Sequence, residues 1–268
     1  MTLAIALAQL ENTPDPTLNL QKAKAAAHEA VRRGAGMIVY PEMFMGLPSP
    51  DRPPARIALD DGGAFLKGLA ALAVETGLWI TAGCWEAISG NSRVYNTAYT
   101  ISPQGETIAA YRKIHLFDAL NVRESDTMVP GQALPPFAEI CGIKVGFVIC
   151  YDLRFPELFR YLALQRIQLV ILPSAWYQGA VKEEHWLTLL RARAIENTFY
   201  VAGCNLVGPA FCGRSALFDP FGIQLAGAGE EESVITGIID PDRIEAVRSK
   251  LPSLRNRRTS IENLHILT

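Results

Sequence analysis

Residues 3–40 indicate the fold class, and they begin with the apolar run LAIALAQL at residues 3–10. An alanine-rich stretch follows at residues 18–33, with helical spacing of its apolar positions, and Gly34 ends it. A second apolar run, MIVY, occupies residues 37–40. We therefore predict a strand, a helix and a strand, the usual opening of an α/β fold.

The same alternation continues through the chain. We expect further helices at residues 64–76, 156–165 and 183–197, and further strands at residues 78–84, 144–149, 169–172 and 199–204. Turn signals at residues 89–91 and 103–105 separate β-rich runs and predict antiparallel hairpins. Helices covering mixed sheets are the expected α/β architecture. The proline-rich residues 48–54 form too short a stretch for an interdomain linker, so we expect one domain over residues 1–268.

The composition is that of an ordinary globular protein. The 268 residues carry a formal net charge of -2, with 49% hydrophobic and 19% charged residues. Basic residues form no block longer than residues 255–258, so we expect neither nucleic acid nor an anionic membrane as a partner. The first apolar run is too short for a signal peptide with its flanks, and no apolar run reaches the roughly 18 residues of a membrane span. The expected location is the cytoplasm.

The cysteines argue against a disulfide framework and against a zinc site. Their number is odd, they are scattered, and they form no C-x-x-C pair. We expect free thiols, most of them small core residues, and no metal or cofactor. The cysteines are Cys84, Cys141, Cys150, Cys204 and Cys212.

Residues that could perform chemistry follow three of the predicted strands. Glu42 comes after MIVYP, Cys150 comes after VGFVI, and Trp176 comes after LVILPSA. Lys113 lies in a fourth, β-like segment. Because open α/β sheets bind ligands beyond the carboxyl ends of their strands, we expect these residues near a pocket. Each alone is weak evidence, since a glutamate after a strand commonly forms a surface ion pair and a lysine is commonly solvated.

Taken together, these segments resemble the Glu–Lys–Cys signature of the nitrilase superfamily. The resemblance covers almost the whole chain. It implies an α-β-β-α sandwich of two mixed sheets flanked by helices, often paired into dimers, and metal-free chemistry at a non-peptide C–N bond. The matching segments are Tyr40-Pro41-Glu42, residues 111–118, Glu124-Ser125, Pro130-Gly131, residues 150–157, Pro173-Ser174-Ala175, His185-Trp186, residues 191–197 and residues 219–222.

The resemblance assigns Cys150 as nucleophile, Glu42 as general base and Lys113 as the cation that holds the oxyanion. A free thiol has a pKa of about 8.5 and needs a neighbouring base and a positive field. Glu42 would accept the thiol proton, return it to the leaving ammonia, and later deprotonate the hydrolytic water. The backbone N–H of Tyr151 would join Lys113 in the oxyanion hole.

Three further residues have expected roles near this set. Glu124 matches the family's second glutamate and would position Lys113 or the substrate, with a surface carboxylate as the alternative. Tyr151 and Trp176 are expected to contact the substrate.

A Cys–His enzyme with His115 or His185 as base is the main rival for the thiol chemistry. If the segment around Lys113 is extended, His115 shares its face, although a hydrogen-bonded supporting role is the simpler expectation. His185 is expected to be structural. For Arg154, the simplest expectation is an ion pair with Glu157, and recognition of a substrate carboxylate is the alternative.

The residues after the nucleophile favour one branch of the family. Cys150-Tyr151-Asp152 resembles amidases and carbamoylases more than true nitrilases, where Trp–Glu commonly follows. Neighbouring segments look like the omega-amidase and deaminated-glutathione amidase group, but only residues 119–123 separate Asp118 from Glu124, where that group has a longer loop. Residues 211–215 look more like bacterial small-molecule amidases.

We therefore predict hydrolysis of a small amide to its acid and ammonia through a cysteine thioester. A nitrilase, an N-carbamoyl amide hydrolase, an acyltransferase and a non-catalytic binding protein remain alternatives.

Overall fold

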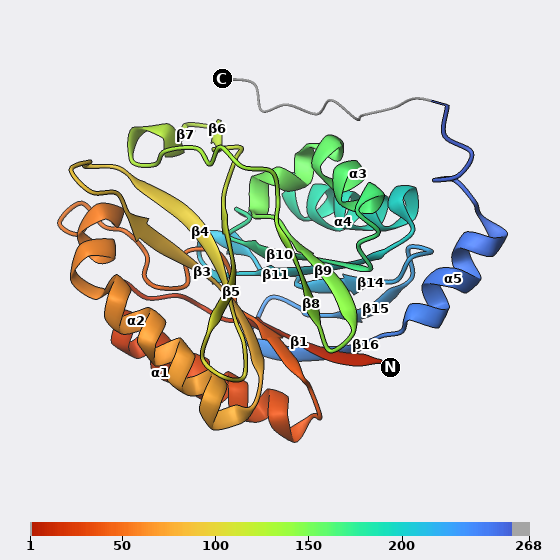
Figure 1. Cartoon of the computed structure of the whole chain (residues 1–268). Helices are drawn as coiled ribbons and strands as arrows, with labels where there is room; N and C mark the ends of the chain where they lie inside the picture. The colour runs from red at the N-terminus through yellow and green to blue at the C-terminus, as the bar shows by residue number, and fades with distance from the viewer. Residues whose placement is uncertain (1, 259–268) are drawn as a thin grey trace.

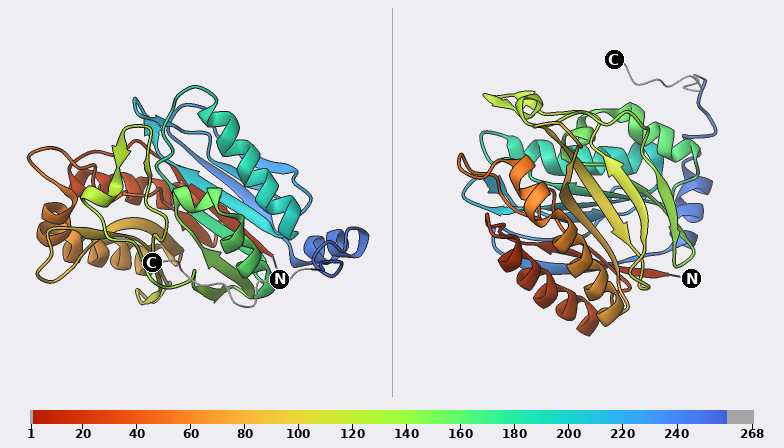
Figure 2. Two further views of the ribbon diagram at one scale, coloured as in Figure 1. Left: turned by 90° about the horizontal axis from the view of Figure 1, so that it is seen from above. Right: turned by 60° about the vertical axis from the view of Figure 1, so that its left-hand side comes forward.

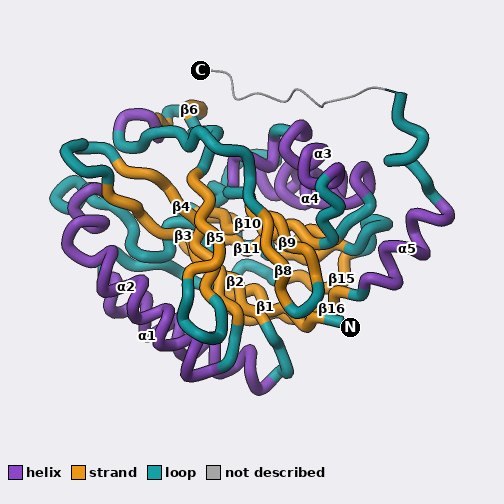
Figure 3. The backbone as a smooth tube through the Cα atoms, in the orientation of Figure 1, coloured by secondary structure: helices purple, strands orange, loops and turns teal. Residues whose placement is uncertain are grey.

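A computed structural model describes residues 2–258 and contains two six-stranded sheets that pack face to face. Helices α1 and α2 cover the outer face of one sheet, and α3 and α4 cover the outer face of the other (Figure 1 and Figure 3). Figure 2 shows α5 beyond the end of these layers. The helices are α1 (Pro16–Arg32), α2 (Pro54–Thr76), α3 (Pro156–Leu164), α4 (Lys182–Asn197) and α5 (Pro241–Lys250).

The first sheet has the strand order β16-β1-β2-β3-β4-β5. Its strands are β16 (Ser233–Ile239), β1 (Leu3–Gln9), β2 (Met37–Val39), β3 (Trp79–Ala87), β4 (Val94–Ile101) and β5 (Thr107–Arg112). The pairs β1–β2 and β2–β3 are parallel and the other neighbours are antiparallel.

The second sheet has the order β15-β14-β11-β10-β9-β8 and is also mixed, with β9, β10 and β11 parallel. Its strands are β15 (Gln224–Gly227), β14 (Ala216–Phe218), β11 (Tyr200–Asn205), β10 (Leu169–Ser174), β9 (Ile143–Phe147) and β8 (Phe137–Ile140). Two small ladders and two short 3-10 helices complete the structure. These are β6 (Asp118–Ala119) with β7 (Val122–Arg123), β12 (Val207–Gly208) with β13 (Phe211–Cys212), η1 (Glu124–Asp126) and η2 (Cys150–Arg154).

The apolar opening of the chain is explained by burial on both faces of β1. Leu3, Ile5 and Leu7 belong to the core between the two sheets. Ala6 and Ala8 belong to a second core, which contains the buried alanines of α1. A strand covered on both faces is apolar at every position, as the sequence is here. The predicted α/β class and the four-layer arrangement of helices and sheets are confirmed.

The start of one predicted helix was wrong. Helix α2 begins at Pro54 and not near residue 64, so part of the proline-rich stretch belongs to its first turn. Gly62 and Gly63 lower the intrinsic helix propensity of this region. Burial of Ile57 and Phe65 on the inner side of the helix compensates for it. Within residues 2–258 no helix is long and apolar enough to cross a membrane.

Candidate active site

The candidate residues gather beyond the carboxyl ends of strands from both sheets. Glu42 lies just past β2, Cys150 lies just past β9, and Ala175 follows β10. Strand β5 runs in the direction of β2, because two antiparallel steps separate it from β3. Lys113, the residue after β5, therefore reaches the same edge of the sandwich. The sequence placed Lys113 inside a strand, whereas the strand ends at Arg112.

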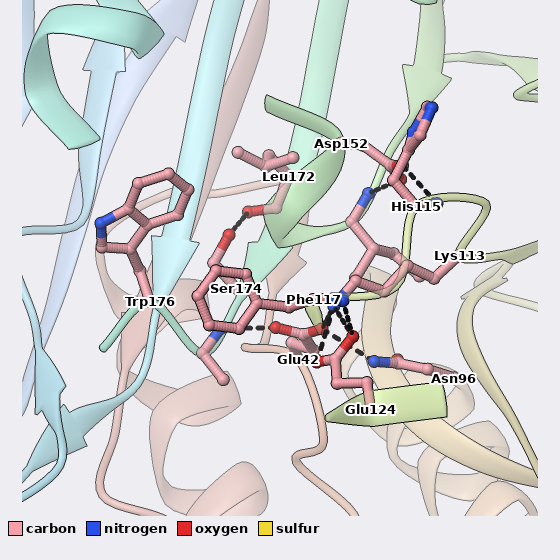
Figure 4. A network of polar contacts seen from close by, with 12 residues as sticks. Glu42, Asn96, Lys113, His115, Phe117, Glu124, Asp152, Leu172, Ser174 and Trp176 are labelled. Carbon is pink, nitrogen blue, oxygen red and sulfur yellow. Dashed lines mark hydrogen bonds and ion pairs between the residues drawn. The ribbon is translucent and has the colours of Figure 1, made fainter. Parts of the chain in front are cut away.

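Glu42 is buried, and both oxygens of its carboxylate accept hydrogen bonds (Figure 4). Its Oε1 accepts hydrogen bonds from Asn96 Nδ2 at 2.7 Å and from Lys113 Nζ at 2.8 Å, and its Oε2 accepts one from the Ala175 backbone N–H at 2.7 Å. The segment also approaches β3 closely. A Cβ added to Gly83 would lie 2.5 Å from the Glu42 Cα, so this approach requires glycine.

Lys113 joins Glu42 to Glu124. Its Nζ donates to Glu42 Oε1 at 2.8 Å and to both Glu124 oxygens at 2.9 and 2.8 Å. Burial lowers the pKa of Lys113, but the charges of Glu124 and Glu42 outweigh it and raise the pKa well above its usual value. Burial raises the pKa of Glu124, with Lys113 acting against this effect. The two carboxylates therefore keep Lys113 a buried cation at neutral pH.

Glu124 is not a surface acid, since its side chain is only 10% exposed. Its Oε2 also accepts from the Phe117 backbone N–H at 2.7 Å. The short connection before it forms the β6–β7 hairpin, whose turn residues Leu120 and Asn121 have φ of 52° and 65°. This tight hairpin lets a short loop bring Glu124 to Lys113.

Cys150 has a strained backbone. Its φ is 43°, in the left-handed region, and it begins the 3-10 turn η2. Strained residues of this kind cluster at functional sites, where the surrounding structure holds them. Burial raises the pKa of the Cys150 thiol, and the charge of Glu42 raises it further. The resting group is a neutral thiol, so attack on a substrate requires proton transfer to a nearby base.

A small hollow opens beside Cys150. A narrow concave site of this kind suits a small molecule better than a folded partner. Burial raises the pKa of Tyr177 to about 12, so its phenol stays neutral. The hollow is lined by Phe117, Glu124, Cys150, Tyr151, Arg154, Ala175, Trp176, Tyr177 and Lys182.

Two cations face this hollow. The Arg154 guanidinium lies 4.7 Å from the centre of the Trp176 ring, and Lys182 Nζ lies 4.9 Å from the same centre. No carboxylate of residues 2–258 lies within ion-pair distance of either cation. The expected Arg154–Glu157 pair was therefore wrong. Stacking on Trp176 turns the guanidinium toward the hollow instead.

The two candidate histidines, His115 and His185, do not line the hollow beside Cys150. The chain turns after Lys113, so His115 does not share its face, and His115 Nδ1 lies 2.8 Å from Asp152 Oδ1 (Figure 4). His185 Nδ1 lies 3.5 Å from Arg154. Neither histidine lines the hollow at Cys150, so the geometry does not favour a Cys–His enzyme. Among residues 2–258, no group of three or more His, Cys, Asp or Glu could hold a metal ion.

Sequence reasoning missed several residues of the site. Asn96 lies inside β4, and Gly83 inside β3, where no local pattern marks them. Lys182 directly precedes the helix predicted at residues 183–197, and no motif there marks it as part of a site. Tyr177 directly follows the predicted Trp176, and this adjacency was the one available signal.

The sequence and the fold are both matched by known proteins. The family model described as carbon-nitrogen hydrolase matches residues 4–249. The chain belongs to this family, and it is a carbon-nitrogen hydrolase.

Individual relatives agree with this placement. The deaminated glutathione amidase of Synechocystis sp. (strain PCC 6803) is 38% identical over 271 residues, covering 95% of this chain and 97% of that protein. An amidase variant of Nesterenkonia sp. AN1 has the acetamide moiety of fluoroacetamide covalently added at its active-site cysteine, and it matches with a TM-score of 0.82 and 27% identity over 96% of this chain and 94% of that chain. The C. elegans NitFhit protein matches with a TM-score of 0.90 and 29% identity, covering 96% of this chain and 65% of that chain.

Proposed function

We propose that this chain is an amidase that converts a small amide to its carboxylic acid and ammonia. Cys150 Sγ attacks the amide carbon while Glu42 takes the thiol proton. The carbonyl oxygen becomes an oxyanion held by Lys113 and the Tyr151 N–H. The C–N bond then breaks as Glu42 gives its proton to the leaving nitrogen.

The resulting thioester is cleaved by water. Glu42 accepts a proton from the water, whose oxygen attacks the thioester carbon. The C–S bond breaks and the proton returns to the Cys150 sulfur. No other reactant is needed, and Glu42 is ready for the next cycle.

The observation that carries this proposal is the buried contact of Lys113 with Glu42 and Glu124 beside Cys150, whose backbone is strained. Burying charged groups is costly, so a buried cation between two carboxylates is weak evidence for a purely stabilising role. Members named as amidases, one with a covalent adduct at its cysteine, support the same conclusion. A non-catalytic binding protein has no use for a base, a cation and a thiol together.

We expect amides to be hydrolysed faster than the matching nitriles. Attack of Cys150 on a nitrile gives a thioimidate, which this site must then hydrolyse through to the acid. Matched pairs of short aliphatic and aromatic substrates are compared, with acid and ammonia measured separately. We expect at least about a tenfold preference for the amide, a barrier difference of about 1.4 kcal/mol. Faster nitrile turnover would make the chain a nitrilase, and turnover of N-carbamoyl compounds alone would make it a carbamoylase.

The two cations at the hollow favour substrates with an anionic group. Arg154 and Lys182 have no carboxylate partner within residues 2–258, and burial together with the charge of Arg154 lowers the pKa of Lys182. A substrate carboxylate would relieve this repulsion. A relative named deaminated glutathione amidase is consistent with such a substrate.

We expect the variants Arg154→Met and Lys182→Met each to raise KM for a carboxylated amide about tenfold, the value of one charge-assisted hydrogen bond. Turnover of an uncharged amide of the same size should change less than about threefold. Lys144→Met is the matched control, because Lys144 also lies over a ring, 4.4 Å from the centre of Phe137 and away from the hollow. Equal losses on both substrates would contradict an anion-binding role.

We also propose that the chain forms one domain and acts in the cytoplasm, as the sequence patterns predict, and that it forms homodimers, as the family resemblance implies. Sedimentation of the purified chain tests the last point, since a monomer mass would contradict it.

A further inference from the structure

Asp152 is a fully buried carboxylate that the catalytic steps above do not use. Each of its two carboxylate oxygens accepts two hydrogen bonds. The donors are Ile149 N at 3.0 Å and Tyr111 Oη at 2.8 Å on Oδ2, and His115 N at 3.2 Å and His115 Nδ1 at 2.8 Å on Oδ1. Each partner can donate, so an ionised carboxylate satisfies all of them.

These donors come from the two halves of the sandwich. Tyr111 lies in β5 of the first sheet, and His115 follows it, so the two residues flank Lys113 in sequence. Ile149 belongs to the other half, directly before Cys150. One carboxylate therefore connects the segment that carries the cation to the segment that carries the nucleophile.

The turn at Cys150 lacks the support of a strand ladder. The register of β9 with β10 ends at the pair Phe147–Ile171, and Val148 N makes one more bond, to Ile171 O at 3.1 Å. The next amide, Ile149 N, donates to Asp152 instead. The chain then enters the left-handed conformation at Cys150. The hydrogen bond to Asp152 thus fixes the backbone at the point where the pairing of β9 with β10 ends.

The donors are themselves held firmly. Burial raises the pKa of Tyr111 well above its usual value, and the charge of Asp152 raises it further, so the phenol remains a donor. The ring of His115 stacks on Phe155 with centroids 3.5 Å apart and planes 6° from parallel. The connection between the two segments is rigid at both ends.

We infer that Asp152 is a positioning residue, which keeps the Cys150 thiol in register with Lys113 and Glu42 by joining the ends of β5 and β9. The inference rests on the proposed function for its effect on turnover. Its effect on thiol reactivity can be measured whether or not an amide is hydrolysed.

The test is the variant Asp152→Asn, built with Cys141→Ser so that the exposed Cys141 thiol does not react. The asparagine amide places an N–H group among donors, so at least one hydrogen bond is lost. We expect alkylation of Cys150 by iodoacetamide to slow by about ten- to a hundredfold, because small misplacements of reacting groups have effects of this size. For a primary amide, kcat should fall to a similar extent, with KM changed less than about threefold.

Asp219→Asn is the matched control. Asp219 is also buried, and it accepts from Phe221 N at 2.9 Å and Ile223 N at 2.8 Å and pairs with Arg243, away from the hollow. The Asp219→Asn variant should have a lower Tm, while its alkylation rate and its kcat should stay within about twofold of the parent values. If Asp152→Asn lowers Tm in the same way and leaves the alkylation rate unchanged, Asp152 is only structural and the inference is wrong.

A milder variant covers the case in which Asp152→Asn does not fold. Tyr111→Phe removes one donor and keeps the ring. We expect its alkylation rate to fall about threefold or more, and an unchanged rate would overturn the inference. Slower alkylation without hydrolysis of any amide would support the positioning role while removing the proposed function.

Discussion

Replacing Cys150 by alanine is expected to reduce amide turnover by about 10⁴-fold or more, the size of effect seen when a nucleophile is removed. The remaining Glu42 and Lys113 can polarise a bound amide, but no atom is left to form the thioester. The purified variant should show no covalent adduct by mass spectrometry after incubation with a haloacetamide in the Cys141→Ser background. Its circular dichroism spectrum should match that of the parent protein, because the thiol contributes little core volume.

Cys84→Ala is the control for loss of a buried thiol. Cys84 lies in β3 and is fully buried in the core beneath α2. Its replacement leaves a cavity and should cost stability, but turnover by the folded enzyme should stay within about threefold. Substantial turnover by Cys150→Ala, or equal losses in both variants, would mean that another group starts the reaction.

The layers of the fold and the positions of the candidate catalytic residues could be predicted from patterns in the sequence. The run at residues 3–10 is apolar throughout because β1 is covered on both faces, and its eight residues are typical of a strand in length. Glu42 and Cys150 each follow such a run directly. The rule that ligands bind beyond the carboxyl ends of strands places them together, and the family motifs add Lys113 and Glu124.

The remaining parts of the site depend on contacts between distant segments. Asn96 reaches Glu42 from the interior of β4, and Asp152 reaches Tyr111 and His115 in the other half of the sandwich. The sequence predicted a hydrogen-bonded supporting role for His115, but nothing near these residues identifies their partners. Helix α2 shows the same limit, since its buried face outweighs two glycines of low helix propensity.

Replacing Lys113 by methionine is expected to cost both activity and stability. Loss of one oxyanion donor commonly reduces kcat by about 10²- to 10³-fold. The carboxylates of Glu42 and Glu124 would also lose their shared cation inside the protein, and removing one partner of a buried pair costs about 3–5 kcal/mol. Lys22→Met is the control, because Lys22 pairs with Glu232 at the same 2.8 Å but on the surface, where such pairs contribute about 0–1 kcal/mol.

The stability loss in Lys113→Met should grow with pH. In the parent protein the raised pKa of Lys113 gives stability that is present below its unfolded pKa of about 10.4 and is lost only as pH rises through the folded value. In the variant, burial still raises the pKa of Glu124, and Lys113 no longer opposes it. The folded variant then binds more protons than the unfolded chain above about pH 4.3, so its stability falls as pH rises toward the folded pKa. Urea unfolding of parent and variant at pH 5 and pH 8 measures this, and an equal difference at both pH values would show that Glu124 does not depend on the Lys113 charge.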